Sequence, residues 1–130
     1  MGKPGVAVID ADLQQGHRVV ALLRQYSYHA AALVSLSEME KHLRQNPCQV
    51  VILDLDTVPV NNQFFRAFKS KNPGVYILVL SRLRHHPGLE EAMGLHIYAC
   101  LGKPFDPEEL LYWLKSIPEN GGKSGEAQEG

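Results

Sequence analysis

Residues 50–54 read Val-Val-Ile-Leu-Asp, four apolar residues in a row that end on a carboxylate. A continuous apolar run of this length is typical of a strand that lies inside a parallel sheet and is covered by helices on both faces. The chain contains four further short apolar runs, and three of them are also continuous. The five predicted strands are Val6–Ile9, Tyr28–Leu33, Val50–Leu53, Tyr76–Leu80 and Tyr98–Leu101.

Between these runs the apolar residues change to helical spacing. The first such stretch has apolar residues at i, i+3, i+4 and i+7, namely Val19, Leu22, Leu23 and Tyr26. This spacing places them on one face of a helix. Helices are predicted around 19–26, 36–43 and 110–117, with shorter ones over 64–69 and 88–94.

Two of the predicted helices carry their own start signals. Ser35 and Glu38 have the spacing of a capping box, in which each side chain accepts a hydrogen bond from a free backbone N–H. Asp106 followed by Pro107 offers an acceptor at the N-cap and a proline at the first helical position. Both signals fix where the helix begins.

Strand and helix alternate five times between residues 6 and 117. Each helix returns the chain to the same end of the sheet, so the strands run parallel. Five units are too few to close an eight-stranded barrel, which favours an open, doubly wound α/β sheet. We therefore expect one domain over residues 1–117. Residues 118–130 read as a linker or disordered tail, because 118–125 contain no apolar residue other than proline.

The charge balance and the cysteines exclude several classes of protein. Lysine and arginine number 13 against 14 acidic residues, a formal net charge of −1. Binding to a nucleic-acid backbone usually needs a marked basic excess, so we expect none here. No apolar run approaches the roughly 20 residues that span a bilayer, and no signal-type stretch follows Met1. We expect a cytoplasmic protein whose Cys48 and Cys100 are reduced and buried.

Polar side chains follow four of the five predicted strands. Asp10 follows the first strand, Asp54 the third, Ser81 the fourth and Lys103 the fifth. Ligands of open α/β sheets bind beyond the carboxyl ends of the strands. We therefore expect two carboxylates, a hydroxyl and an ammonium group to meet at one edge of the sheet.

Such an arrangement needs positive charge. Asp10 and Asp54 each follow an apolar run and should be partly buried, and close carboxylates repel by about 4 kcal/mol at an effective dielectric near 20. Lys103 or a hard divalent cation, Mg²⁺ or Mn²⁺, would offset this repulsion. Asp12 and Asp56 lie two residues further on, where a helix cap or turn role is the alternative. The pair His85-His86 lies beside a proline in a loop, and we expect it to be solvated.

Four segments together resemble the signature segments of bacterial response-regulator receiver domains, in that family's order and spacing. They are Val8-Ile9-Asp10, Val51-Ile52-Leu53-Asp54-Leu55, Leu78-Val79-Leu80-Ser81 and Leu101-Gly102-Lys103-Pro104-Phe105. The resemblance implies a flavodoxin-like sheet with strand order 2-1-3-4-5 and helices on both faces. It also implies that Asp54 accepts a phosphoryl group from a histidine kinase or a phosphotransfer protein of a phosphorelay.

The resemblance implies further roles at the same edge. Ser81 would hydrogen-bond the phosphoryl oxygens, and Lys103 would pair with the phosphoryl group across a Lys-Pro bond that is often cis. Mg²⁺ would be held by Asp10, Asp54 and the residue at position 56. The domain would act as a phosphoacceptor rather than as a classical enzyme. Its switching face, formed by the fourth helix, fifth strand and fifth helix, would bind an effector domain, another protein or a second copy of the chain.

The chain departs from the family pattern in three places. Ala11 replaces a second acid that is a direct metal ligand, so Mg²⁺ binding should be weaker than usual. Thr57-Val58-Pro59 replaces the usual Met-Pro, which predicts a re-shaped loop, and Cys100 replaces the aromatic switch residue. These departures support an alternative, a degenerate receiver that binds a partner without a phosphorylation cycle. A flavin-binding domain is disfavoured, because the acidic first turn lacks a Gly/Ser/Thr-rich phosphate loop.

Overall fold

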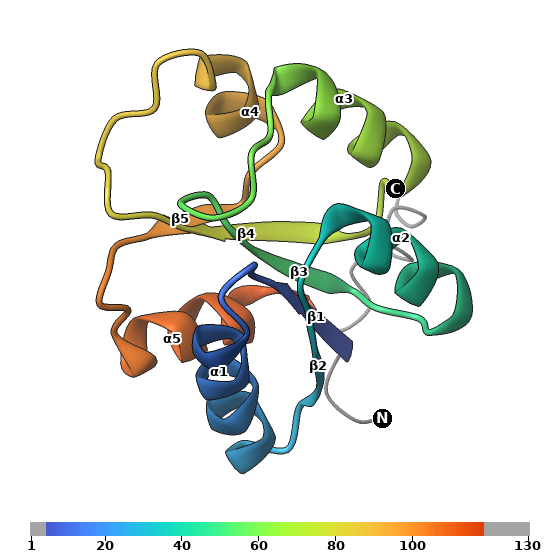
Figure 1. The fold of residues 1–130 in the computed structure, drawn as a ribbon, viewed down its shortest axis with the longest axis vertical. Coiled ribbons are helices and arrows are strands. Elements are labelled where there is room, and N and C mark those ends of the chain that lie inside the picture. The colour runs from blue at the N-terminus through green and yellow to red at the C-terminus, as the bar shows by residue number, and fades with distance from the viewer. Residues whose placement is uncertain (1–4, 119–130) are drawn as a thin grey trace.

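Strands and helices alternate strictly along the chain in the computed structural model, which describes residues 5–118 (Figure 1). The tail expected over 118–130 lies outside the described residues, apart from Pro118. In chain order the elements are β1 (Gly5–Ile9), α1 (Leu13–Gln25), β2 (His29–Leu33), α2 (Leu36–Gln45), β3 (Val50–Asp54), α3 (Asn62–Lys71), β4 (Tyr76–Leu80), α4 (Glu90–Leu95), β5 (Ala99–Leu101) and α5 (Pro107–Ser116).

The five strands form one parallel sheet in the order β2-β1-β3-β4-β5. The order confirms the expected doubly wound α/β fold. In the centre of the sheet Val6 of β1 pairs with Val50 of β3, which in turn pairs with Tyr76 of β4. The direction of winding reverses between β1 and β3. Ligand sites of such sheets form beyond the strand ends at this reversal, so Asp10 and Asp54 flank the expected crevice.

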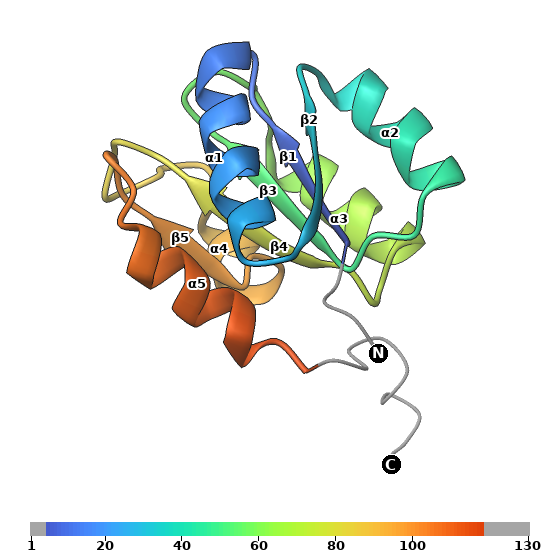
Figure 2. The same cartoon turned by 90° about the horizontal axis from the view of Figure 1, so that it is seen from below.

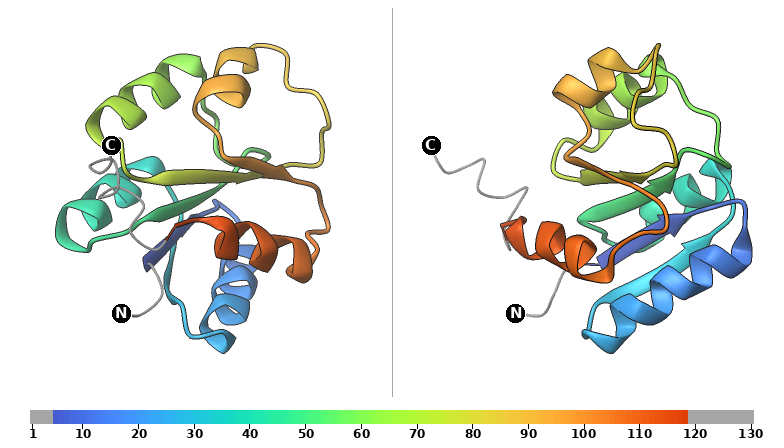
Figure 3. Two further views of the ribbon diagram at one scale, coloured as in Figure 1. Left: turned by 180° about the vertical axis from the view of Figure 1, so that it is seen from behind. Right: turned by 90° about the vertical axis from the view of Figure 1, so that its left-hand side faces the viewer.

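Helices cover both faces of the sheet. Helices α1 and α5 lie below it in Figure 1, while α3 and α4 lie above it on the face that α2 shares. Figure 2, seen from below, shows α1 and α5 together in front of the sheet, and Figure 3 shows the same layers from two further sides. Each face has its own apolar cluster, with Leu23 and Leu110 on one side and Met39 and Phe65 on the other. Covered on both faces, β3 is buried along its whole length, as its continuous apolar sequence predicted.

The helix starts follow the sequence signals, with one change. Ser35 Oγ accepts from the Glu38 N–H at 3.1 Å, as the capping box requires. Glu38 Oε1, however, accepts from the Val34 N–H at 3.0 Å, one residue earlier than a standard box. Asp106 accepts from the Glu108 N–H at 2.9 Å, with Pro107 as the first helical residue. These caps fix where α2 and α5 begin.

Several predicted boundaries were wrong. Helix α3 begins at residue 62 rather than 64, because the Asn61 side chain caps it by accepting from the Phe64 N–H. Helix α4 begins at residue 90 rather than 88, after Gly88 with a φ of +91°, and no side chain caps it. Tyr28 and Tyr98 precede their strands instead of beginning them.

The expectation that both cysteines are buried was also wrong. Cys48 is half-buried and Cys100 is exposed, although both are free thiols. Strand β5 is a short edge strand in which Ala99 and Leu101 point inward, so the alternation of side chains turns Cys100 outward. Within residues 5–118, no helix combines the length and the apolar character that crossing a membrane requires.

Candidate functional site

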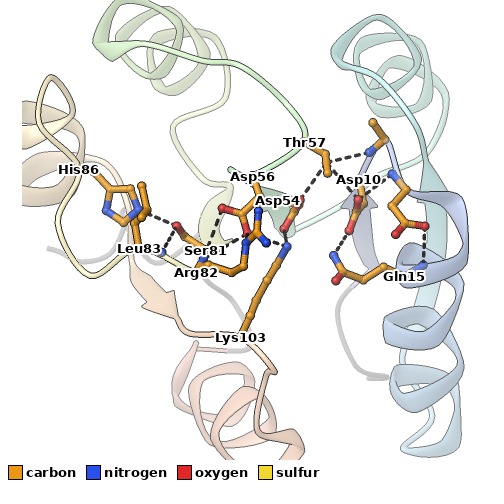
Figure 4. A network of polar contacts seen from close by, with 12 residues as sticks. Asp10, Gln15, Asp54, Asp56, Thr57, Ser81, Arg82, Leu83, His86 and Lys103 are labelled. Carbon is orange, nitrogen blue, oxygen red and sulfur yellow. Dashed lines mark hydrogen bonds and ion pairs between the residues drawn. The ribbon is translucent and has the colours of Figure 1, made fainter.

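The polar residues at the strand ends meet at one edge of the sheet (Figure 4). Asp10 directly follows β1, Asp54 is the last residue of β3, and Ser81 directly follows β4. Each of these three side chains is only 1% exposed, and among the described residues they are the buried polar or charged ones. Burial of two carboxylates is costly unless partners compensate them, so their contacts decide what the site can do.

Lys103 supplies the counter-charge. Its Nζ lies 2.5 Å from Asp54 Oδ1 and 2.8 Å from Asp56 Oδ2, so one ammonium group joins two carboxylates. Burial alone would lower the pKa of Lys103, but the contacts with Asp54 and Asp56 outweigh it and raise the pKa above its ordinary value. The following peptide bond, to Pro104, is cis. Lys103 therefore stays charged and directed at Asp54.

Asp56 belongs to the same cluster rather than acting as a simple turn residue. Its carboxylate accepts from the Arg82 N–H at 3.1 Å and lies 3.5 Å from the Arg82 guanidinium. Burial would raise the pKa of Asp56, but Lys103 and Arg82 together lower it below its ordinary value. Asp12, in contrast, is the N-cap of α1 and accepts from the Gln14 and Gln15 N–H groups. The cap role is thus correct for Asp12, whereas Asp56 lies in the turn after β3 and also contacts Lys103.

Thr57, which sequence reasoning did not single out as a site residue, lies between the two buried carboxylates. Its Oγ1 is 2.8 Å from Asp54 Oδ2 and 3.1 Å from Asp10 Oδ1, and it accepts from the Ala11 N–H at 3.0 Å. The only signal was the unusual loop after Asp54. A hydroxyl three residues after an aspartate gives no indication by itself that it will bridge to another strand.

Asp10 has two more partners. Its Oδ1 accepts from the Asp12 N–H at 2.8 Å, and its Oδ2 accepts from the side-chain amide of Gln15 in the first turns of α1. Counting Thr57, protein donors therefore reach both oxygens of this carboxylate. Gln15 was also missed from the sequence, because a glutamine five residues after an acid is unremarkable on a helix.

The residues present do not fit a ready Mg²⁺ site. Within residues 5–118, no three side chains of histidine, cysteine, aspartate or glutamate are grouped so that they could hold a metal ion. The oxygens that would be ligands are already in contact with Thr57, Gln15 and Lys103. Position 11, where an acid was expected in the family pattern, carries an alanine. Carboxylate oxygens of the kind that Mg²⁺ prefers are present at this edge of the sheet, but protein donors already contact them.

The prediction that both His85 and His86 are solvated was wrong for His86. His86 Nε2 lies 2.8 Å from Ser81 Oγ, and Ser81 Oγ also accepts from the Leu83 N–H at 3.0 Å. His86 is half-buried, whereas His85 is exposed. Ser81 is therefore held by its own loop, on the far side of Asp56 from Thr57 in Figure 4. A contact between residues five apart in an irregular loop cannot be read from sequence spacing.

Comparison with known proteins adds to this geometry. Residues 6–115 match the family model described as response regulator receiver domain. Similar solved structures include a CheY-like receiver domain protein from Methanospirillum hungatei JF-1, at 14% identity and a TM-score of 0.80, covering 95% of this chain and 99% of that one.

Two further solved structures are similar in fold. The signal receiver domain of an HD domain-containing protein from Pseudomonas fluorescens Pf-5 has 19% identity and a TM-score of 0.78, covering 88% of this chain and 93% of that one. The chemotaxis response regulator CheY4 of Vibrio cholerae has 22% identity and a TM-score of 0.74, with 89% and 99% covered. No curated protein matches the chain significantly.

Proposed function

The chain belongs to the family of response regulator receiver domains, and we propose that it accepts a phosphoryl group on Asp54. Receiver domains are signalling phosphoacceptors rather than classical enzymes. One observation carries the proposal: a buried carboxylate at the end of the central strand has a lysine ammonium 2.5 Å away. We assign the receiver domain to residues 1–117.

In the proposed transfer, a carboxylate oxygen of Asp54 attacks the phosphorus of a phosphohistidine on the donor protein. A P–O bond to Asp54 forms while the P–N bond to the donor imidazole breaks, and the imidazole leaves. The acceptor's main task is to position the group and to balance the charge on its equatorial oxygens. Lys103 is already directed at Asp54, which supports its role as that counter-charge.

Ser81 is proposed to donate a hydrogen bond to a phosphoryl oxygen. Its oxygen lies 2.8 Å from His86 Nε2, and in the His86 tautomer that accepts the Ser81 proton this bond must be exchanged for the new one. The incoming group has about −2 charge at neutral pH, and charge-assisted hydrogen bonds are roughly twice as strong as neutral ones. The exchange is therefore favourable once Asp54 is phosphorylated, and it would pull the loop between β4 and α4 toward the site.

Receiver domains generally bind Mg²⁺ at their acidic pocket. In this chain Asp10, Asp54 and Asp56 are the expected oxygen ligands, and we propose that binding is weak because their carboxylates are not grouped for an ion until the present donors withdraw. Support comes from Ala11 and from the protein donors that already contact Asp10 and Asp54.

The proposed donor is a histidine kinase or a phosphotransfer protein in the cytoplasm. The proposed output is a change in the face formed by α4, β5 and α5, read by an effector domain, another protein or a second copy of the chain. Helix α4 has only six residues and no side-chain cap, and a long irregular loop leads into it. Such segments lie at the low-stability end of a domain, where switching elements are usually found.

A second candidate function is a degenerate receiver that binds its partner without phosphorylation. The observation that favours it is the Thr57 hydroxyl between Asp10 and Asp54, which compensates both carboxylates without a metal or a phosphoryl group. In this case the described arrangement would be the functional one.

A small-molecule phosphoryl donor separates the two candidates. The protein is incubated with phosphoramidate and Mg²⁺, and its intact mass is measured over a range of donor and metal concentrations. Phosphorylation predicts one added phosphoryl group in the wild type and none in Asp54→Asn. An unmodified wild type at every concentration would favour the degenerate receiver.

A further inference from the structure

The two most buried carboxylates within residues 5–118 share one hydroxyl. Thr57 Oγ1 lies 2.8 Å from Asp54 Oδ2 and 3.1 Å from Asp10 Oδ1. Each carboxylate is 1% exposed, so solvent does little to screen the repulsion between them. The hydroxyl has one proton and therefore donates to one carboxylate at a time, but its position between them serves both.

The backbone holds Thr57 in this position. The Ala11 N–H donates to Oγ1 at 3.0 Å, which orients the hydroxyl proton toward the carboxylates. Thr57 lies in a tight turn that is closed by a hydrogen bond from the Val58 N–H to the Asp54 carbonyl at 3.1 Å. Val58 is buried in the apolar cluster on the α2, α3 and α4 face, which anchors the turn.

The two oxygens of Asp54 have separate partners. Oδ1 contacts Lys103, and Oδ2 contacts Thr57. Lys103 also contacts Asp56, so the ammonium lies on one side of Asp54 and the hydroxyl on the other. A cation that joined Asp10 to Asp54 through these oxygens would compete for them with the Thr57 hydroxyl.

We propose that the Thr57 hydroxyl takes the place of a divalent cation between Asp10 and Asp54, and that Thr57 limits metal binding more than Ala11 does. The hydroxyl is a donor directed at the same oxygens that a cation needs. It must withdraw before the ion can bind, and its hydrogen bonds are lost in the exchange. An aspartate at position 11 would add a ligand but would leave this obstacle in place.

Binding of Mn²⁺ alone tests the proposal, with free Mn²⁺ followed by electron paramagnetic resonance and Mg²⁺ as competitor. Removing a hydrogen bond to a charged group that the metal must displace should tighten binding by about tenfold in Thr57→Ala. Thr57→Ser keeps the hydroxyl and should bind as the wild type does. Ala11→Asp should gain less than Thr57→Ala.

Equal affinity of wild type and Thr57→Ala would overturn the proposal, as would a larger gain from Ala11→Asp. If Thr57→Ala does not fold, the wild type provides the second measurement. Saturating Mg²⁺ should shift the NMR resonances of the Thr57 methyl group together with those around Asp54, and an unchanged Thr57 methyl would contradict displacement. Neither measurement uses a phosphoryl donor, so failure of this inference is visible separately from failure of Asp54 phosphorylation.

Discussion

The two sides of Asp54 differ in how the protein compensates a buried carboxylate that has a second carboxylate beside it. On one side an ammonium group, Lys103, joins Asp54 to Asp56, and an exposed arginine supports Asp56 from outside. On the other side a neutral hydroxyl, Thr57, joins Asp54 to Asp10, and an amide from Gln15 completes the set. The first side balances charge with charge, while the second distributes hydrogen bonds over two anions. We expect the first to contribute more to stability and the second to decide which ions enter.

Removal of Lys103 should cause the largest loss of stability. Lys103→Ala leaves the buried Asp54 carboxylate without its cation, and breaking a buried pair in this way costs about 3 kcal/mol. Urea unfolding of wild type and variant measures this loss. Arg66→Ala, which removes the solvent-exposed pair with Glu91, is the matched control and should change the free energy of unfolding much less. Equal losses in the two variants would contradict the buried role of Lys103.

Removal of the Thr57 hydroxyl should cost less. Thr57→Val keeps the shape of the side chain but takes a donor from two buried carboxylates, which corresponds to about 1.5 kcal/mol. The measurement is the same urea unfolding, in the presence of a chelator so that no cation replaces the hydroxyl. If Thr57→Val lost more free energy of unfolding than Lys103→Ala, the neutral side of Asp54 would contribute more to stability than the charged side, contrary to our expectation.

The pH dependence of stability should report on the charged side of Asp54, to which both Asp56 and Lys103 belong. The pKa of Asp56 in the folded protein is lowered from 3.8. The contribution of the Asp56 carboxylate to the free energy of unfolding is therefore present above pH 3.8 and is lost as the pH falls through the folded pKa. The pKa of Lys103 in the folded protein is raised from 10.5. The contribution of the Lys103 ammonium group to the free energy of unfolding is therefore present below pH 10.5 and is lost as the pH rises through the folded pKa.

The stability difference between wild type and Asp56→Asn should therefore be constant from about pH 5 to pH 9 and shrink at both extremes. Urea unfolding at a series of pH values measures it. A difference that changes steadily through neutral pH would mean that another titrating group controls Asp56.

The smallest expected effect concerns His86. When His86 Nε2 is the acceptor of the Ser81 proton, His86→Ala removes a hydrogen bond that must break before Ser81 can donate to a phosphoryl group. A neutral hydrogen bond is worth about 1 kcal/mol, so the rate of phosphorylation by phosphoramidate should rise about fivefold. His85→Ala changes the exposed neighbour and should leave the rate as it is. A slower His86→Ala protein would mean that His86 positions Ser81 for the reaction instead of holding it back.

The sequence predicted the charged side of the site and missed the neutral one, for a physical reason. Parallel strands bring their carboxyl ends to one edge, so Asp10, Asp54, Ser81 and Lys103 had to lie near one another once the strands were recognised. Thr57 lies in a turn whose side-chain directions follow no repeating pattern. Its role depends on the position of Asp10, which is 47 residues away.

The same limit explains the other corrections. His86 reaches Ser81 through an irregular loop, and neither residue has a helix or strand period that would relate them. Cys100 was expected to be buried because its neighbours are apolar, but β5 has only three residues at the sheet edge, and the middle one faces outward. Element order and the parallel, open sheet followed from periodicity, and the strand order followed from the family resemblance, whereas contacts made by turns and loops required the structure.

Chemical mapping of the phosphorylated residue distinguishes Asp54 from the other aspartates of the chain. The protein is treated with phosphoramidate, reduced with borohydride to convert an aspartyl phosphate to homoserine, and digested for peptide mass spectrometry. We expect homoserine at position 54 in the wild type and none there in Asp54→Asn. Homoserine at another aspartate, or an unmodified Asp54 at saturating donor and metal, would contradict the assignment of Asp54 as the phosphoacceptor.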